Sequence, residues 1–402
     1  MHQGQFGDEE MRQLGFLQGN LRALLIGLLA FCQLNIVSSS YSAVLSSIRE
    51  DLLLSYTLSG FLMSSYFVGY ALGQLPWGYF ADRSGSGRAM ALSVFGCSIS
   101  TVFLGLSSTS LQAILSRFLA GLLGAGVFVP GVRLISSLFP AEKRGRALGF
   151  FSIGGSVGLI LASWVTPLMS VSVGWKTSMM IYGLVGCAIA VAIWRMLPHE
   201  DQIRTSAEPV EERVSSRQTY DTSFWVLALV QFVRLGSNYT FIAWMPLVLQ
   251  EEYGLNVLAA GLMLSLFNLA GLVSNPLGGL FSDRLGEKSL IAVSFFALAL
   301  NLLVFVYIHA IIGVALAIFL LGWFVNFVRS PSFTIIPKLY GAKRAGKMSG
   351  IENTFASIGS LVLPLLLGYV RDMASSYYVG WMSLLLLVLI SASTCFLLEV
   401  PR

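Results

Sequence analysis

Long apolar runs separated by short polar connections make up most of the chain. A bilayer core is about 30 Å thick, so a helix rising about 1.5 Å per residue needs about 20 apolar residues to cross it. Twelve runs are long enough: residues 21–45, 58–80, 89–107, 111–138, 146–170, 176–197, 223–249, 257–281, 289–308, 311–337, 347–370 and 377–398. The pattern predicts an all-α membrane protein with 12 transmembrane helices.

The one long polar interruption separates the sixth run from the seventh. Residues 198–221 mix acidic, basic and serine side chains with Pro209, which is the composition of a flexible linker. The pattern therefore predicts a six-helix bundle at 21–197 and a second at 222–402. Residues 1–20 are expected to form a cytoplasmic N-terminal tail.

The two predicted bundles repeat one another at an offset of 201 residues. The turn Asp82-Arg83 recurs as Asp283-Arg284, and each turn ends a long apolar run. Further matches at the same offset are Glu50 with Glu251, Pro130 with Pro331, Gly149 with Gly350 and Gly158 with Gly359. Duplicated membrane bundles of this kind are typical of proteins that carry a solute across a bilayer.

Composition supports lipid as the solvent of this chain. Hydrophobic residues make up 55% and charged residues 11%, whereas soluble domains have roughly 45–50% and about 25%. The four cysteines stand singly in apolar runs without the spacing of a metal site, so we expect neither a metal nor a cofactor.

Lysine and arginine counts predict the orientation in the membrane. Eighteen basic residues fall on the side of both termini and the even-numbered connections, and three fall on the other side: Arg49, Lys176 and Arg371. We expect an integral protein of the plasma (inner) membrane with both termini in the cytoplasm. The net charge of +5 follows from this asymmetry and gives no support for nucleic-acid binding.

Two motifs carry a resemblance to a known family. Both polar turns read Gly-x-x-x-Asp-Arg-x-Gly. The known motif continues with a basic pair, and the residues after Gly85 and Gly286 match that pair only in part. The fourth run contains Arg117-Phe118-Leu119-Ala120-Gly121, close to Arg-x-x-x-Gly. Over its whole length the chain resembles the major facilitator superfamily. This resemblance implies two pseudo-symmetric six-helix bundles, with helices one, four, seven and ten lining a central cavity.

Ionisable residues are rare inside the predicted spans, where each costs about 2.5–3.5 kcal/mol to insert. Five lie well inside: Arg117, Arg133, Arg234, Arg329 and Glu352. Four cations against one carboxylate leave the interior positive, and a guanidinium fork suits carboxylate, phosphate or another oxyanion. Arg234, near the middle of the seventh span, is the main candidate for substrate contact, with pairing to backbone or water as the alternative.

Arg329 and Glu352 are expected at the same depth, because they lie at similar distances from the connection between the tenth and eleventh spans. One hypothesis is a buried ion pair between them. The alternative is that Glu352 carries a coupling proton.

Uncharged residues complete the candidate substrate site. Gln33 occupies the repeat position of Arg234, which suggests that the two contribute to one pocket. Arg117 is expected either to line the cavity or to pack between helices. The other candidates are polar or aromatic residues within spans: Asn35, Tyr41, Asn238, Tyr239, Trp323 and Asn326.

The two polar turns predict a cytoplasmic gate. By resemblance, such turns hold the cytoplasmic side closed in the outward-facing state and release it during the switch; an ordinary solvated loop is the alternative. The predicted gate residues are Asp82, Arg83, Arg133, Asp283 and Arg284.

These observations favour a secondary active transporter that moves a small, anionic solute by alternating access. The coupling ion would be H+ or Na+, and a monomer is sufficient. Alternatives are a proton-coupled drug or metabolite efflux antiporter, and a transport-inactive membrane sensor or assembly component. The fifth span lacks the Gly-Pro pairing typical of the family's antiporters. An enzyme is disfavoured because none of the three histidines lies inside a span.

Overall fold

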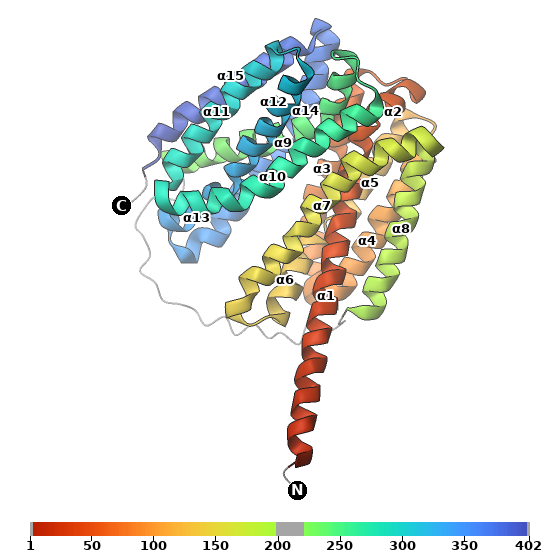
Figure 1. Ribbon diagram of the computed structural model, residues 1–402, viewed down its shortest axis with the longest axis vertical. Helices are drawn as coiled ribbons and strands as arrows, with labels where there is room; N and C mark the ends of the chain where they lie inside the picture. The colour runs from red at the N-terminus through yellow and green to blue at the C-terminus, as the bar shows by residue number, and fades with distance from the viewer. Residues whose placement is uncertain (1–2, 198–220, 400–402) are drawn as a thin grey trace.

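A computed structural model describes residues 3–197 and 221–399, with the side chains of residues 3–19, 141–142, 283 and 342–347 excepted. The predicted linker, apart from residue 221, lies outside these residues. Every regular element in the described ranges is helical. Figure 1 shows two groups of helices that come together at the end where α2 lies and diverge toward the end where α1 begins.

The first half of the chain forms eight helices. They are α1 (Gln3–Ala43), α2 (Leu45–Asp51), α3 (Tyr56–Ser84), α4 (Ser86–Gly105), α5 (Ser110–Gly124), α6 (Phe128–Leu138), α7 (Ala141–Val173) and α8 (Trp175–Met196). The second half forms α9 (Thr222–Glu251), α10 (Val257–Leu285), α11 (Glu287–Tyr307), α12 (Ile311–Phe327), α13 (Arg329–Tyr340), α14 (Ala342–Ala374), α15 (Tyr377–Thr394) and the 3₁₀ turn η1 (Cys395–Leu397).

The predicted spans correspond to these helices. Within the described ranges eleven spans are long and apolar enough to cross a membrane, counting α5 with α6 and α12 with α13 as one span each. A twelfth is reached when α3 is taken together with α2, from which it is bent by 118°. One difference lies at the start of the chain, where α1 is helical from Gln3 although a tail was expected over 1–20.

The fourth and tenth spans are each broken into two helices, which the apolar pattern did not predict. The new helix begins at Phe128 in one half and at Arg329 in the other. Pro130 and Pro331 each stand at the third position of that new helix. Their missing N–H costs no intrahelical bond there, because the first turn of any helix leaves its N–H groups unpaired.

The two halves meet along two helix pairs, α3 with α14 and α7 with α10. Glycine allows the close approach in each: a Cβ atom on Gly60 would lie 2.7 Å from the carbonyl oxygen of Pro364, and one on Gly261 would lie 2.5 Å from that of Ser163. Small residues permit such backbone contact in membrane bundles. These contacts bring α9, and the arginine that it carries, next to the first half.

Candidate functional site

Two arginines of the second half lie near each other without a carboxylate partner. Arg234 on α9 is 4% exposed, and its Nε donates a hydrogen bond of 2.9 Å to Gln231 Oε1. Arg329, the first residue of α13, has an exposed side chain. The two guanidinium groups act electrostatically on each other. Among the described residues neither forms an ion pair with an acidic side chain, so the pair forms a centre of positive charge.

Aromatic and amide side chains surround this centre. The Tyr239 side chain, one turn after Arg234, lies within electrostatic range of both arginines. Its ring meets that of Phe67 on α3 at 4.3 Å, which places it where the two halves join. Phe333 lies beneath the Arg234 guanidinium, 5.9 Å from ring centroid to Cζ. We call Arg234, Tyr239, Arg329 and Phe333 the arginine site.

Asn238 and Asn326 connect two helices beside this site. Asn326 Nδ2 donates a hydrogen bond of 3.3 Å to Asn238 Oδ1 and another of 3.0 Å to the Gly322 carbonyl in its own helix. The bond links α12 to α9 near the arginine site. Both asparagines were predicted for the substrate site, and the structure brings them together with each other.

Arg117 is held by backbone carbonyls in the first half. It is 1% exposed, and its nitrogens donate to Leu62 at 3.3 Å, Val37 at 2.8 Å and Ser38 at 2.9 Å. The guanidinium also lies over the Tyr41 ring, 4.3 Å from its centroid. These contacts tie α5 to α1 and α3, so the geometry favours the packing role over the cavity role.

Three other predicted substrate residues make contacts elsewhere in the structure. Gln33 Nε2 donates to the Tyr182 carbonyl of α8 at 2.9 Å, so it faces its own half instead of Arg234. Asn35 donates to the Phe31 carbonyl one turn back in its helix. Trp323 stacks on Phe327 within the tenth span. Gln33 and Arg234 therefore each hydrogen-bond within their own half.

Glu352 does not make the predicted ion pair. Its side chain on α14 is 0% exposed, and neither carboxylate oxygen has a hydrogen-bond partner. The Arg329 guanidinium lies within electrostatic range of Arg234 instead. Arg329 stands eleven residues before the end of α13 and Glu352 ten residues after the start of α14, and no hydrogen bond joins the two side chains.

The two polar turns differ in their contacts. Asp82 at the end of α3 forms an ion pair with Arg133 on α6, within the first half, and Arg83 lies over the Tyr79 ring. The repeat counterpart of Arg133 is Thr334, which has no charge. Arg284 is exposed, and the Asp283 side chain lies outside the described residues. The contact between Asp82 and Arg133 is thus present in one half and has no charged equivalent in the other.

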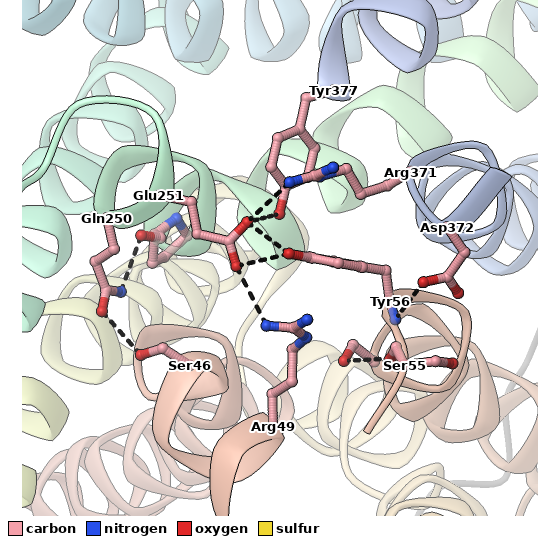
Figure 2. Close-up of polar contacts among 11 residues, drawn as sticks. Ser46, Arg49, Ser55, Tyr56, Gln250, Glu251, Arg371, Asp372 and Tyr377 are labelled. Atoms are coloured by element: carbon pink, nitrogen blue, oxygen red, sulfur yellow. Dashed lines mark hydrogen bonds and ion pairs between the residues drawn. The ribbon is translucent and has the colours of Figure 1, made fainter. Parts of the chain in front are cut away.

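A cluster of charged and tyrosine side chains joins the two halves at the α2 end. Glu251, at the end of α9, accepts hydrogen bonds of 2.9 Å from the hydroxyls of Tyr56 and Tyr377. It also pairs with Arg49 at 3.3 Å and with Arg371 at 3.6 Å. Figure 2 shows Arg49 and Tyr56 reaching it from the first half and Arg371 and Tyr377 from the second. We call these five residues the Glu251 cluster.

Contacts beside the Glu251 cluster reinforce the same junction. Asp372 accepts hydrogen bonds from the backbone N–H groups of Tyr56 at 3.0 Å and Thr57 at 2.7 Å, so a carboxylate of the second half caps the start of α3. Ser46 donates to Gln250 at 2.8 Å. At the opposite end, no hydrogen bond or ion pair between described residues joins the halves.

The sequence analysis did not predict the Glu251 cluster. Two signals were present: Arg49 and Arg371 are two of only three basic residues on that side, and Glu251 recurs as Glu50 at the repeat offset. Neither signal shows which side chains converge, because the cluster brings together five helices from three separate parts of the chain.

Comparison with known proteins gives a family match over nearly the whole chain. The model of the Major Facilitator Superfamily matches residues 24–226 and again 227–402. This double match agrees with the repeat in the sequence.

Individual relatives agree with the family match. The probable galactarate/D-glucarate transporter GudP of Bacillus subtilis is 27% identical over 379 residues, covering 82% of this chain and 81% of that protein. The nitrite extrusion protein of Bacillus subtilis is 25% identical over 350 residues, covering 85% of each. A bacterial homologue of the human lysosomal transporter Spinster, in an inward-facing and occupied conformation, shares the fold with a TM-score of 0.80 at 18% identity, covering 93% of this chain and 95% of that one.

Proposed function

Because the chain belongs to the Major Facilitator Superfamily, we propose that it is a secondary transporter that carries a small anion by alternating access. The observation that carries the proposal is the arginine site, where two guanidinium groups lie together without a carboxylate partner among the described residues. The concentration of basic residues on one side supports an orientation with both termini in the cytoplasm.

The electrostatics of the arginine site favour an anion. Arginine stays protonated under all ordinary conditions, so the charges of Arg234 and Arg329 repel each other until a negative group lies between them. A guanidinium binds carboxylates and other oxyanions through two parallel hydrogen bonds. Two such groups suit a substrate with two acidic groups, and the relative GudP is named for galactarate and D-glucarate, which are dicarboxylates.

The polar contacts at the α2 end support an inward-facing state of the proposed cycle. The Glu251 cluster and the Asp372 cap join the halves on the side that we assign as extracellular. On the assigned cytoplasmic side, described residues form no polar contact between the halves. The switch would break the Glu251 cluster and close the cytoplasmic side, where Asp82 and Arg133 are the candidate gate residues.

The same features of the chain disfavour a drug exporter and an enzyme, and a flux measurement distinguishes a sensor. A site for cationic drugs would need buried carboxylates, whereas the arginine site presents two cations. Catalysis would need a nucleophile with a base, and the sequence places no histidine inside a span. A sensor of the same fold would bind an anion without moving it, so a flux measurement separates it from a transporter.

Ligand-dependent thermal unfolding of the purified protein tests the binding site. A ligand at about 100 times its Kd stabilises the folded state by about 2.7 kcal/mol. We expect galactarate to raise Tm more than nitrite, and D-galactose and tetraethylammonium to leave it unchanged. The galactarate effect should disappear in Arg234→Gln and persist in Arg284→Gln, which changes an exposed arginine of a polar turn. Stabilisation by tetraethylammonium, or an unchanged galactarate effect in Arg234→Gln, would contradict the proposal.

A further inference from the structure

The internal repeat shows which contacts are made in the first half by the residues equivalent to Arg329 and Glu352. Their counterparts at the 201-residue offset are Phe128 and Phe151. These two rings stack at 6.2 Å, and both contact Phe31, at 5.0 Å and 5.2 Å. Side chains at these two positions can therefore reach each other across consecutive helices. The second half has an arginine and a glutamate where the first half has an aromatic pair.

In the second half, Arg329 and Glu352 form no ion pair with each other. Glu352 is fully buried with both oxygens unpartnered, while the Arg329 side chain is exposed and belongs to the arginine site. An ionised carboxylate buried without a hydrogen-bond donor is so costly that such groups take up a proton instead. The arrangement therefore corresponds to a neutral Glu352 and an Arg329 free to bind an anion.

The helices packed against α14 supply no other partner for Glu352. They are α3, α9, α13 and α15. Their described charged and titratable side chains in the spans include Tyr66, Tyr70, Arg234, Tyr239, Arg329, Lys338, Tyr340 and Tyr377. None of these hydrogen-bonds to Glu352, whose two carboxylate oxygens are buried without a partner. Arg329 is the cation that the repeat places within reach.

We propose that Glu352 is the proton carrier of this transporter and that its protonation releases Arg329 for the anion, an inference that rests on the proposed function. With Glu352 ionised, its carboxylate pairs with Arg329 and competes with the substrate. A proton taken from extracellular water neutralises Glu352, breaks this pair and lets the anion bind. In the inward-facing state the anion and the proton leave to the cytoplasm, and the carboxylate recaptures Arg329. Proton and anion thus move in the same direction.

The coupling is reciprocal, because a proton that favours anion binding must itself be held more tightly when the anion is bound. For one proton per anion, the Kd rises by at most about tenfold per pH unit once Glu352 begins to lose its proton. Without the carboxylate this dependence disappears, and the anion should bind as tightly as to the protonated wild type.

The test is the Kd of galactarate between about pH 6 and about pH 9, a range in which the galactarate carboxylates stay ionised. We expect the wild-type Kd to rise with pH, Glu352→Gln to bind tightly at every pH, and Arg329→Gln to bind weakly at every pH. The control Glu50→Gln, at an exposed position, should follow the wild type. Glu352→Phe introduces the residue of the repeat counterpart and provides a second neutral variant if the first does not fold.

A transport assay with reconstituted protein gives an independent readout. Both neutral variants should exchange galactarate across the membrane without a pH gradient, yet fail to accumulate it when a pH gradient is imposed. A neutral variant that keeps the wild-type pH dependence, or that accumulates galactarate along a proton gradient, would overturn the assignment of Glu352. If the wild type binds no anion at any pH, the proposed function itself fails. That outcome differs from one in which the wild type binds the anion but Glu352 is not the proton carrier.

Discussion

Buried arginines serve two different purposes in this chain. Arg117 donates to three backbone carbonyls and lies over a tyrosine ring, so its charge is compensated where it stands. Arg234 has a single hydrogen bond to Gln231 and lies near another arginine. The first arrangement stabilises the folded protein, whereas the second leaves donors for a ligand.

This difference predicts opposite effects on stability. Arg117→Met should lower the free energy of unfolding by about 3 kcal/mol or more, because three hydrogen bonds donated by a buried charged group are lost. Arg234→Met should leave it unchanged or raise it, because the variant removes an uncompensated buried charge. Thermal unfolding in detergent without ligand measures both. The two roles would be reversed if Arg117→Met left the free energy of unfolding unchanged and Arg234→Met lowered it.

At the scale of single residues, the sequence identified the charged groups but not their directions. The cost of charge in lipid made Arg234, Arg329 and Glu352 stand out in an apolar chain. Helical periodicity could not show that Gln33 faces α8 or that the Glu352 carboxylate lies without a hydrogen-bond partner. Such directions depend on packing against helices that are distant in sequence.

The short helix α2 and the end of α9 meet at the polar junction between the two halves, on the side that we propose to be extracellular. Glu251 accepts hydrogen bonds from two tyrosines and forms ion pairs with two arginines, so it holds together residues of α2, α3, α14 and α15. Its side chain remains 23% exposed, which allows water to replace these contacts. A junction of this kind can open without exposing an apolar core.

We expect Glu251→Gln to separate the two halves at the α2 end, because the ion pairs that join them there are lost. The measurement is the distance between spin labels at the exposed residues Leu106 and Ile312, one in each half at that end, in a background without the native cysteines. Glu50→Gln, the repeat counterpart without these contacts, is the control. An unchanged distance distribution in Glu251→Gln would remove the cluster from the gate.

The helix breaks show why element boundaries were harder to predict than spans. Apolar length identifies a span directly, because lipid requires every backbone group to be bonded within the helix. Proline does not identify a break in the same way. Pro76, Pro167 and Pro246 lie inside continuous helices, whereas Pro130 and Pro331 follow breaks. Neighbouring helices satisfy the carbonyls that a proline leaves free, and the sequence does not show which neighbours these are.

For the whole molecule, two halves of similar architecture have acquired different chemistry. The repeat sets the helices of both halves in equivalent places, but the arginine site and Glu352 belong to the second half, and the Arg117 contacts belong to the first. The family match and the solved neighbour confirm the fold. The distribution of charge between the halves could not follow from the fold, because both halves share it.

Counterflow of galactarate into liposomes that contain the purified protein tests the central claim most directly. Vesicles loaded with unlabelled galactarate should take up labelled galactarate, since alternating access exchanges substrate across the membrane without a driving ion. Arg234→Gln and Arg329→Gln should each reduce the initial rate by at least about tenfold, the equivalent of about 1.4 kcal/mol. Arg195→Gln, at an exposed position of α8, should leave it unchanged. Uptake by the wild type that persists in both arginine-site variants would contradict the account.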